Sequence, residues 1–121
     1  MSLLAGFINS DGGILLIGVS DDGTISGLDD EIKKFHKDSD DKLLLHFKNI
    51  TASRIGEAFY PCFNSKLIKV KDKKILAVHC LKSDKPCFVD NEQFFVRTNP
   101  ATDNLTGRKM YDYIETHFKN S

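Results

Sequence analysis

The side chains with the clearest chemical potential are cations near the middle of the chain. Residues 66–85 contain seven lysines and only two aspartates. Four of the lysines surround a predicted hairpin turn: Lys69, Lys71, Lys73 and Lys74. Ammonium groups on a β-ribbon can contact the phosphates of a nucleic acid. These four lysines are therefore candidate phosphate contacts, and the alternative is a solvated surface of mixed charge.

A second candidate lies at Arg97, which ends a predicted strand and is followed by Thr98 and Thr102. A guanidinium group presents a planar fork that matches phosphate oxygens, and neighbouring hydroxyl groups add donors. We add Arg97, Thr98 and Thr102 to the candidate nucleic-acid contacts. The alternative role for Arg97 is a salt bridge to an acidic neighbour that holds the last helix.

Metal chemistry has weaker support in the sequence. Asp21 and Asp22 precede Gly23, but such a triplet is also typical of a tight turn. A second set could bind zinc: Cys62, His79, Cys80 and Cys87. Its spacing is irregular, and buried free cysteines often serve as small apolar side chains. We expect no metal site, no cofactor and no catalytic residue.

The segment from Asn9 to Gly13 resembles a phosphate-binding turn, because successive N–H groups in glycine-rich turns can bind anions. It lacks the Gly-Lys-Ser/Thr ending of a nucleotide-binding loop and precedes a predicted strand instead of a helix. We therefore expect Gly12 and Gly13 to supply backbone conformations that other residues avoid.

Length and composition predict one domain over residues 1–121. The net charge is zero, which weighs against strong nonspecific binding to a polyanion, although residues 20–41 hold eight acidic and three basic side chains. Three cysteines without a Cys-x-x-Cys pair do not indicate a secreted disulfide framework. The sequence contains no apolar run long enough to cross a bilayer and no secretion signal. A cytoplasmic protein without a membrane partner is expected.

The first half of the chain predicts two strands and a long helix. Residues 14–19 are apolar on both faces, which is typical of a central strand covered on both sides. A turn at Asp22 and Gly23 would return the chain as a second strand over residues 24–28. Apolar spacing predicts an amphipathic helix over residues 40–55, capped by Asp40 or Asp41.

The second half predicts a hairpin, a strand and a final helix. Strands over residues 67–71 and 75–81 flank a turn, and a further strand covers residues 92–98. Thr102 or Asp103 would cap the last helix. The order of elements predicts an α+β fold: a mixed, mainly antiparallel sheet built from hairpins, with two main helices.

With this order established, the chain resembles the Schlafen and AlbA-like DNA-binding domain family. Three stretches carry the resemblance: residues 7–28, 78–86 and 95–102. The first contains Asn9 before the Gly12-Gly13 pair, followed by Ile17-Gly18-Val19 and Gly27-Leu28; the second ends in Lys85-Pro86; the third contains Phe95-Val96-Arg97 and Thr102.

The resemblance implies a noncatalytic nucleic-acid-binding module of a bacterial transcriptional regulator, with DNA as the expected partner. Family members usually begin with a helix that carries Glu-Ser and Glu-Phe-Lys motifs, which this sequence lacks, so a fragment of a longer protein is expected. In the Schlafen nucleases, two glutamates of that helix join an aspartate whose position is similar to Asp21. A metal-dependent ribonuclease with its glutamates upstream is thus the second option. The third is an oligomerisation or ligand-sensing domain, in which an open sheet edge pairs two copies as a homodimer.

Overall fold

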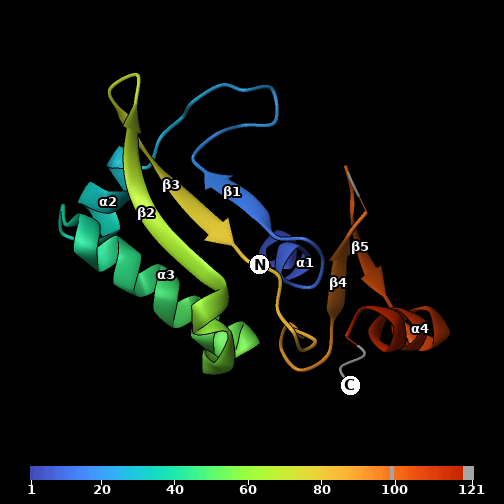
Figure 1. Cartoon of the computed structure of the whole chain (residues 1–121). Coiled ribbons are helices and arrows are strands. Elements are labelled where there is room, and N and C mark those ends of the chain that lie inside the picture. The colour runs from blue at the N-terminus through green and yellow to red at the C-terminus, as the bar shows by residue number, and fades with distance from the viewer. Residues whose placement is uncertain (99, 119–121) are drawn as a thin grey trace.

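The computed structural model describes residues 1–98 and 100–118. The elements in chain order are α1 (Ser2–Ile8), β1 (Gly13–Ile17), α2 (Asp29–Phe35), α3 (Asp40–Ile55), the 3₁₀ helix η1 (Glu57–Cys62), β2 (Phe63–Val70), β3 (Lys73–Cys80), β4 (Phe94–Arg97), β5 (Thr102–Leu105) and α4 (Gly107–His117) (Figure 1). The α+β class is confirmed. The strands form two antiparallel sheets, one with the order β1-β3-β2 and the other made of β4 and β5.

Helix α1 joins the two sheets. Its apolar side chains Leu4, Ala5 and Ile8 are fully buried and belong to the same core as Leu76 and Val78 of β3. Figure 1 shows α3 running along the three-stranded sheet on one side of the molecule, while β4, β5 and α4 lie beyond α1 on the other. None of the helices within residues 1–98 and 100–118 is long and apolar enough to span a bilayer.

The β2–β3 hairpin is confirmed, with a shorter turn than predicted. Only Lys71 and Asp72 form the turn, and both have positive φ angles, of 50° and 63°. Two-residue turns of this handedness match the twist of antiparallel strands. Lys73 and Lys74 therefore belong to β3, where they pair with Val70 and Lys69.

The prediction for residues 14–19 was wrong about their place in the sheet. Strand β1 lies at the edge, and its outward side chains Ile14 and Leu16 are 62% and 44% exposed. Residues 24–28, all of which the structure describes, do not form the predicted return strand. Ile25 makes a single β-bridge to Val19. Strand β3 takes the partner position beside β1, and a positive φ angle of 103° at Gly18 turns the chain away.

The predicted N-cap residues of α3 and of the last helix were both wrong. Helix α3 spans the predicted residues, but Ser39 caps it by accepting a hydrogen bond from the Lys42 backbone N–H at 3.3 Å. Asp40 and Asp41 lie in the first turn, where acidic side chains interact favourably with the helix dipole.

The last helix begins later than predicted, at Gly107, with Thr106 at the N-cap position. Thr102 and Asp103 lie in β5, opposite Arg97 and Val96. The backbone groups of this segment pair with the preceding strand β4 in a hairpin, and this pairing takes the place of the predicted helix start.

Candidate nucleic-acid interface

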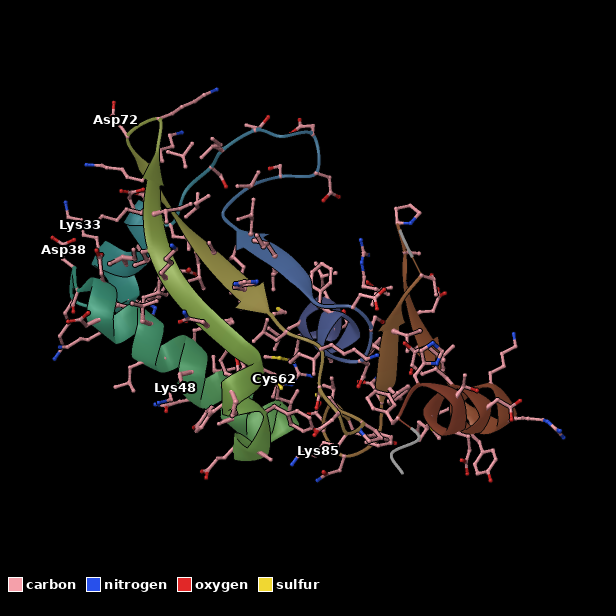
Figure 2. The ribbon with its side chains drawn as sticks, viewed as in Figure 1. Lys33, Asp38, Lys48, Cys62, Asp72 and Lys85 are labelled. Carbon is pink, nitrogen blue, oxygen red and sulfur yellow. The ribbon has the colours of Figure 1, made fainter. Side chains whose placement is uncertain are left out.

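The β2–β3 hairpin places the four candidate lysines in two different situations. Lys69 and Lys71 are exposed and have no hydrogen-bond or ion-pair partner among the residues that the structure describes. Lys74 forms an ion pair within the protein, because its Nζ lies 2.9 Å from Asp40 Oδ1. Figure 2 shows Asp72 at the far tip of the hairpin, away from the body of the protein.

Two lysines beside the turn attach the hairpin to other parts of the chain. The hydrogen bond from Lys74 to Asp40 raises the pKa of Lys74. Lys73 Nζ donates to the carbonyl oxygen of Ile25 at 3.2 Å, which ties the hairpin to the loop after β1. An ammonium group has three N–H donors, so Lys73 keeps donors for a phosphate beside this contact, whereas the ammonium groups of Lys69 and Lys71 make no such contact.

Arg97 holds the turn between β4 and β5. Its Nη1 donates to the Pro100 carbonyl oxygen at 2.8 Å and to Thr102 Oγ1 at 3.0 Å. Its guanidinium carbon lies 5.3 Å from the centre of the Phe7 ring, close enough for a cation–π contact. The alternative salt bridge to an acidic side chain is not among the ion pairs between described residues. Only Nη1 makes these bonds, so the guanidinium keeps donors for an anion.

The three candidates of this second hairpin lie together. Thr98 Oγ1 donates to Asp103 Oδ2 at 2.8 Å, and the hydroxyl of Thr102 accepts from Arg97. Both threonines therefore help to brace the hairpin. In the view of Figure 1, the tip of the β2–β3 hairpin and the loop over residues 18–28 lie toward the same end of the molecule.

The loop over residues 18–28 carries Asp21 and Asp22, and both are exposed. Asp22 Oδ1 accepts a hydrogen bond from the Thr24 backbone N–H at 2.9 Å, and this bond lowers the pKa of Asp22. Asp22 thus stabilises the turn, as the sequence predicted.

The described residues do not fit a metal centre. Nowhere in residues 1–98 and 100–118 do three His, Cys, Asp or Glu side chains converge as ligands, around Asp21 or elsewhere. Burial raises the pKa of Cys80 and Cys87 to about 12, so both are neutral thiols at physiological pH. We therefore assign no metal-dependent step to these side chains.

Asn9 has a structural role that the sequence analysis missed. Its Nδ2 donates to the carbonyl oxygens of Cys87 and Phe95, and its Oδ1 accepts from the Cys87 N–H, each at 2.8 Å. Tyr113 donates to the backbone oxygen of Asn9, also at 2.8 Å. The only available signal was the position of Asn9 before the glycine pair, and the sequence predicted a backbone role for the two glycines without a role for the Asn9 side chain.

Gly12 has the backbone role that was expected. Its φ angle is 77°, and a Cβ atom added there would lie 2.6 Å from the carbonyl oxygen of Cys80. A larger residue would therefore push β1 away from β3 at the point where the strand begins.

A further group of side chains gathers on the open face of the three-stranded sheet. They line a small cavity of about 190 Å³: Ile14, Asn64, Lys66, Ala77 and His79. Lys66 belongs to the lysine-rich segment of the sequence, but nothing in the sequence identified Asn64 as its neighbour.

Comparison with solved structures shows the fold again. The crystal structure of the DIP2311 protein from Corynebacterium diphtheriae aligns with a TM-score of 0.62 and 17% sequence identity. The match covers 94% of this chain and 21% of that one, so the chain spans about a fifth of the length of its structural neighbour. No protein of curated function matches the sequence.

Comparison with protein families identifies the domain. The family described as Schlafen, AlbA_2 matches residues 1–106, which is most of the 121-residue chain. This family fits a nucleic-acid-related function, in agreement with the expectation from the sequence. The chain belongs to the Schlafen, AlbA_2 family.

Proposed function

We propose that residues 1–121 form one noncatalytic nucleic-acid-binding domain, directed to DNA and belonging to a bacterial transcriptional regulator. The β2–β3 hairpin makes the main phosphate contacts. Arg97, Thr98 and Thr102 of the second hairpin make further ones.

The observation that carries this proposal is the pair of unpartnered ammonium groups on a projecting hairpin. Lys69 and Lys71 are exposed, and neither is neutralised by a carboxylate within the described residues. Strands β1, β2 and β3 contain no acidic residue at all. Asp72 in the turn is the one acidic residue of the hairpin, so a phosphate backbone can approach the strands of this ribbon without repulsion.

The two hairpins contribute differently to the proposed contact. Lys69 and Lys71 bind phosphates directly, and Lys73 joins them with the N–H donors that its hydrogen bond to Ile25 does not use. Lys74 has a supporting role and makes no phosphate contact, since its ion pair with Asp40 fixes the hairpin to α3. Arg97 offers its remaining N–H donors from a guanidinium group that is already oriented by the β4–β5 turn.

The test is fluorescence anisotropy of labelled duplex DNA, single-stranded DNA and structured RNA at several salt concentrations. The variant Lys69→Gln/Lys71→Gln removes two charges and leaves the ion pair of Lys74 intact. The matched control is Lys42→Gln/Lys109→Gln, which removes two exposed charges from α3 and α4.

Binding to duplex DNA should weaken as salt rises, because bound phosphates release counterions. The hairpin variant should reduce the slope of log Kobs against log salt by about 1.8 for duplex DNA, or about 0.9 for each lost contact. The control variant should keep the wild-type slope. Equal slopes for the wild type and the hairpin variant would remove the hairpin from the interface.

A homodimer is a second candidate, and the position of β1 favours it. Within the described residues, β1 pairs only with β3, so its other edge has free backbone groups. Pairing of two β1 edges would place two hairpins on one particle. Light scattering after size-exclusion chromatography would give twice the 13.6 kDa mass of the chain for a dimer, and the monomer mass would exclude it.

A further inference from the structure

The open face of the three-stranded sheet presents two rows of side chains across all three strands. Ile14, His79 and Asn64 occupy neighbouring register positions in the first row. Leu16, Ala77 and Lys66 occupy the second row. Side chains directly opposite one another in antiparallel strands lie about 4.5–5.5 Å apart, so each row is a continuous surface.

This part of the face lies beyond the cover provided by the loop after β1. The loop packs over Ile75, because Gly18 lies against its side chain, and Ile75 is only 3% exposed. The rows at Ala77 and His79 lie further along the strand, and Ile14 and Lys66 are exposed there. The cavity between the two rows has a volume of about 190 Å³.

The groups around the cavity combine anion recognition with an apolar wall. Lys66 supplies an ammonium group, and the Asn64 amide adds a hydrogen-bond donor. The apolar wall is formed by Ile14 and Ala77, with Leu16 beside them. No acidic side chain lines this cavity.

A nucleotide with an unpaired base matches both parts of this surface. Its phosphate suits Lys66 and Asn64, while the face of its base can cover Ile14 and Leu16. A base-paired duplex presents mainly phosphates and sugars on its outside, so it would leave these apolar side chains uncovered. Single strands offer their base faces to protein side chains.

We propose that the open sheet face binds an unpaired segment of the nucleic acid, with a phosphate at Lys66 and a base against Ile14 and Leu16. This inference rests on the proposed function, because it adds a second contact surface to the one on the β2–β3 hairpin. Side chains alternate between the two faces of a strand, so Lys66 projects from the open face, while Lys69 projects from the face that carries Lys74 and its ion pair with α3. The hairpin then binds phosphates of either form, and the sheet face distinguishes the single strand.

The test compares one labelled 20-nucleotide DNA as a single strand and as a duplex, by fluorescence anisotropy. The variant Ile14→Thr/Lys66→Gln changes the sheet face, and Lys42→Gln/Leu45→Thr makes the same two types of change on exposed positions of α3. The sheet variant should lose about tenfold in affinity for the single strand, from one ionic contact and the apolar area that a base covers at Ile14. Its affinity for the duplex, and both affinities of the α3 control, should stay within twofold of the wild type.

A second variant keeps the proposal testable if the double variant unfolds. Asn64→Asp preserves side-chain size and places a negative charge beside Lys66, so it should also weaken single-strand binding selectively. Circular dichroism and the thermal midpoint check that each variant is folded.

The outcomes separate this inference from the proposed function. If Lys69→Gln/Lys71→Gln weakens both DNA forms while the folded sheet variants bind both normally, the inference is wrong and the proposed function stands. Equal weakening of both forms by the sheet variants would also overturn it. Absence of binding to either form by the wild-type protein would overturn both proposals.

Discussion

Replacement of Asn9 by Ala should be among the most destabilising single changes in this domain. The Asn9 side chain is completely buried and makes three hydrogen bonds of 2.8 Å. Its partners are two backbone groups of Cys87 and the carbonyl oxygen of Phe95. These bonds connect the end of α1 to the segment before β4 and to β4 itself, so their loss weakens the contact between three parts of the chain.

The expected magnitude follows from the three backbone groups left without a partner. Each buried donor or acceptor that loses its hydrogen bond costs about 1–3 kcal/mol, and the smallest values sum to about 3 kcal/mol. A domain of this size has a free energy of unfolding of about 5–15 kcal/mol in total. The variant should therefore lose a large fraction of its stability.

Urea denaturation followed by circular dichroism measures this loss. With a slope of about 2 kcal/mol per molar urea, a loss of 3 kcal/mol lowers the midpoint by about 1.5 M. The matched control is Asn64→Ala, an exposed position that should change stability by less than about 0.5 kcal/mol. A stability of Asn9→Ala within 1 kcal/mol of the wild type would refute the assignment of Asn9 as the central connection.

Three further predictions concern the backbone at Gly12, the loss of stability at low pH and the reactivity of the cysteine thiols. Gly12→Ala should lower the thermal midpoint by several degrees, because of the positive φ angle and the 2.6 Å approach of a backbone carbonyl; an unchanged midpoint would show that the strand start can relax. Hydrogen bonds from Arg54 lower the pKa of Asp90, so their stabilisation is present above about pH 4 and is lost as pH falls through the lower, folded-state pKa. Asp90→Asn should reduce this acid dependence in urea midpoints measured from pH 2 to pH 6, and an identical dependence in both proteins would contradict the role of the pair. Iodoacetamide at pH 8 should label the partly exposed Cys62 well before Cys80 and Cys87, which are protected by their burial and their pKa of about 12. Equal labelling rates of the three cysteines, measured by mass spectrometry of the native protein, would contradict the burial of Cys80 and Cys87.

Local sequence patterns predicted the elements whose stability is decided locally. The periodic apolar residues of α3 fixed its span, and the polar turn at Asp72 identified the β2–β3 hairpin. The cap of α3 was missed because Ser39 and Asp40 are both good N-cap residues, and the chain uses the earlier one.

Strand pairing decided the features that were predicted wrongly. Residues 14–17 are apolar throughout, which suits a central strand, yet β1 lies at the edge with Ile14 and Leu16 exposed. The pairing of β1 with the distant strand β3 leaves little trace in a single sequence. The segment Thr102–Leu105 pairs with the neighbouring strand β4 instead of starting a helix, although Thr102 and Asp103 are residue types that also suit a helix N-cap.

The candidate site was predictable by residue type but not by arrangement. The sequence could identify a lysine-rich hairpin and an arginine at a strand end. It could not reveal that Lys74 is paired with Asp40, or that Arg97 already binds Thr102. These contacts join segments from different elements or span a turn whose shape depends on the fold.

The most direct test of the account is the salt dependence of DNA binding by the wild-type protein and by Lys69→Gln/Lys71→Gln. We expect the wild type to bind with an affinity that falls as salt rises, and the variant to show a slope smaller by about 1.8. Wild-type protein that binds no DNA at concentrations well above about 10⁻⁴ M, or a variant with the wild-type slope, would contradict the assignment of the hairpin as the nucleic-acid interface.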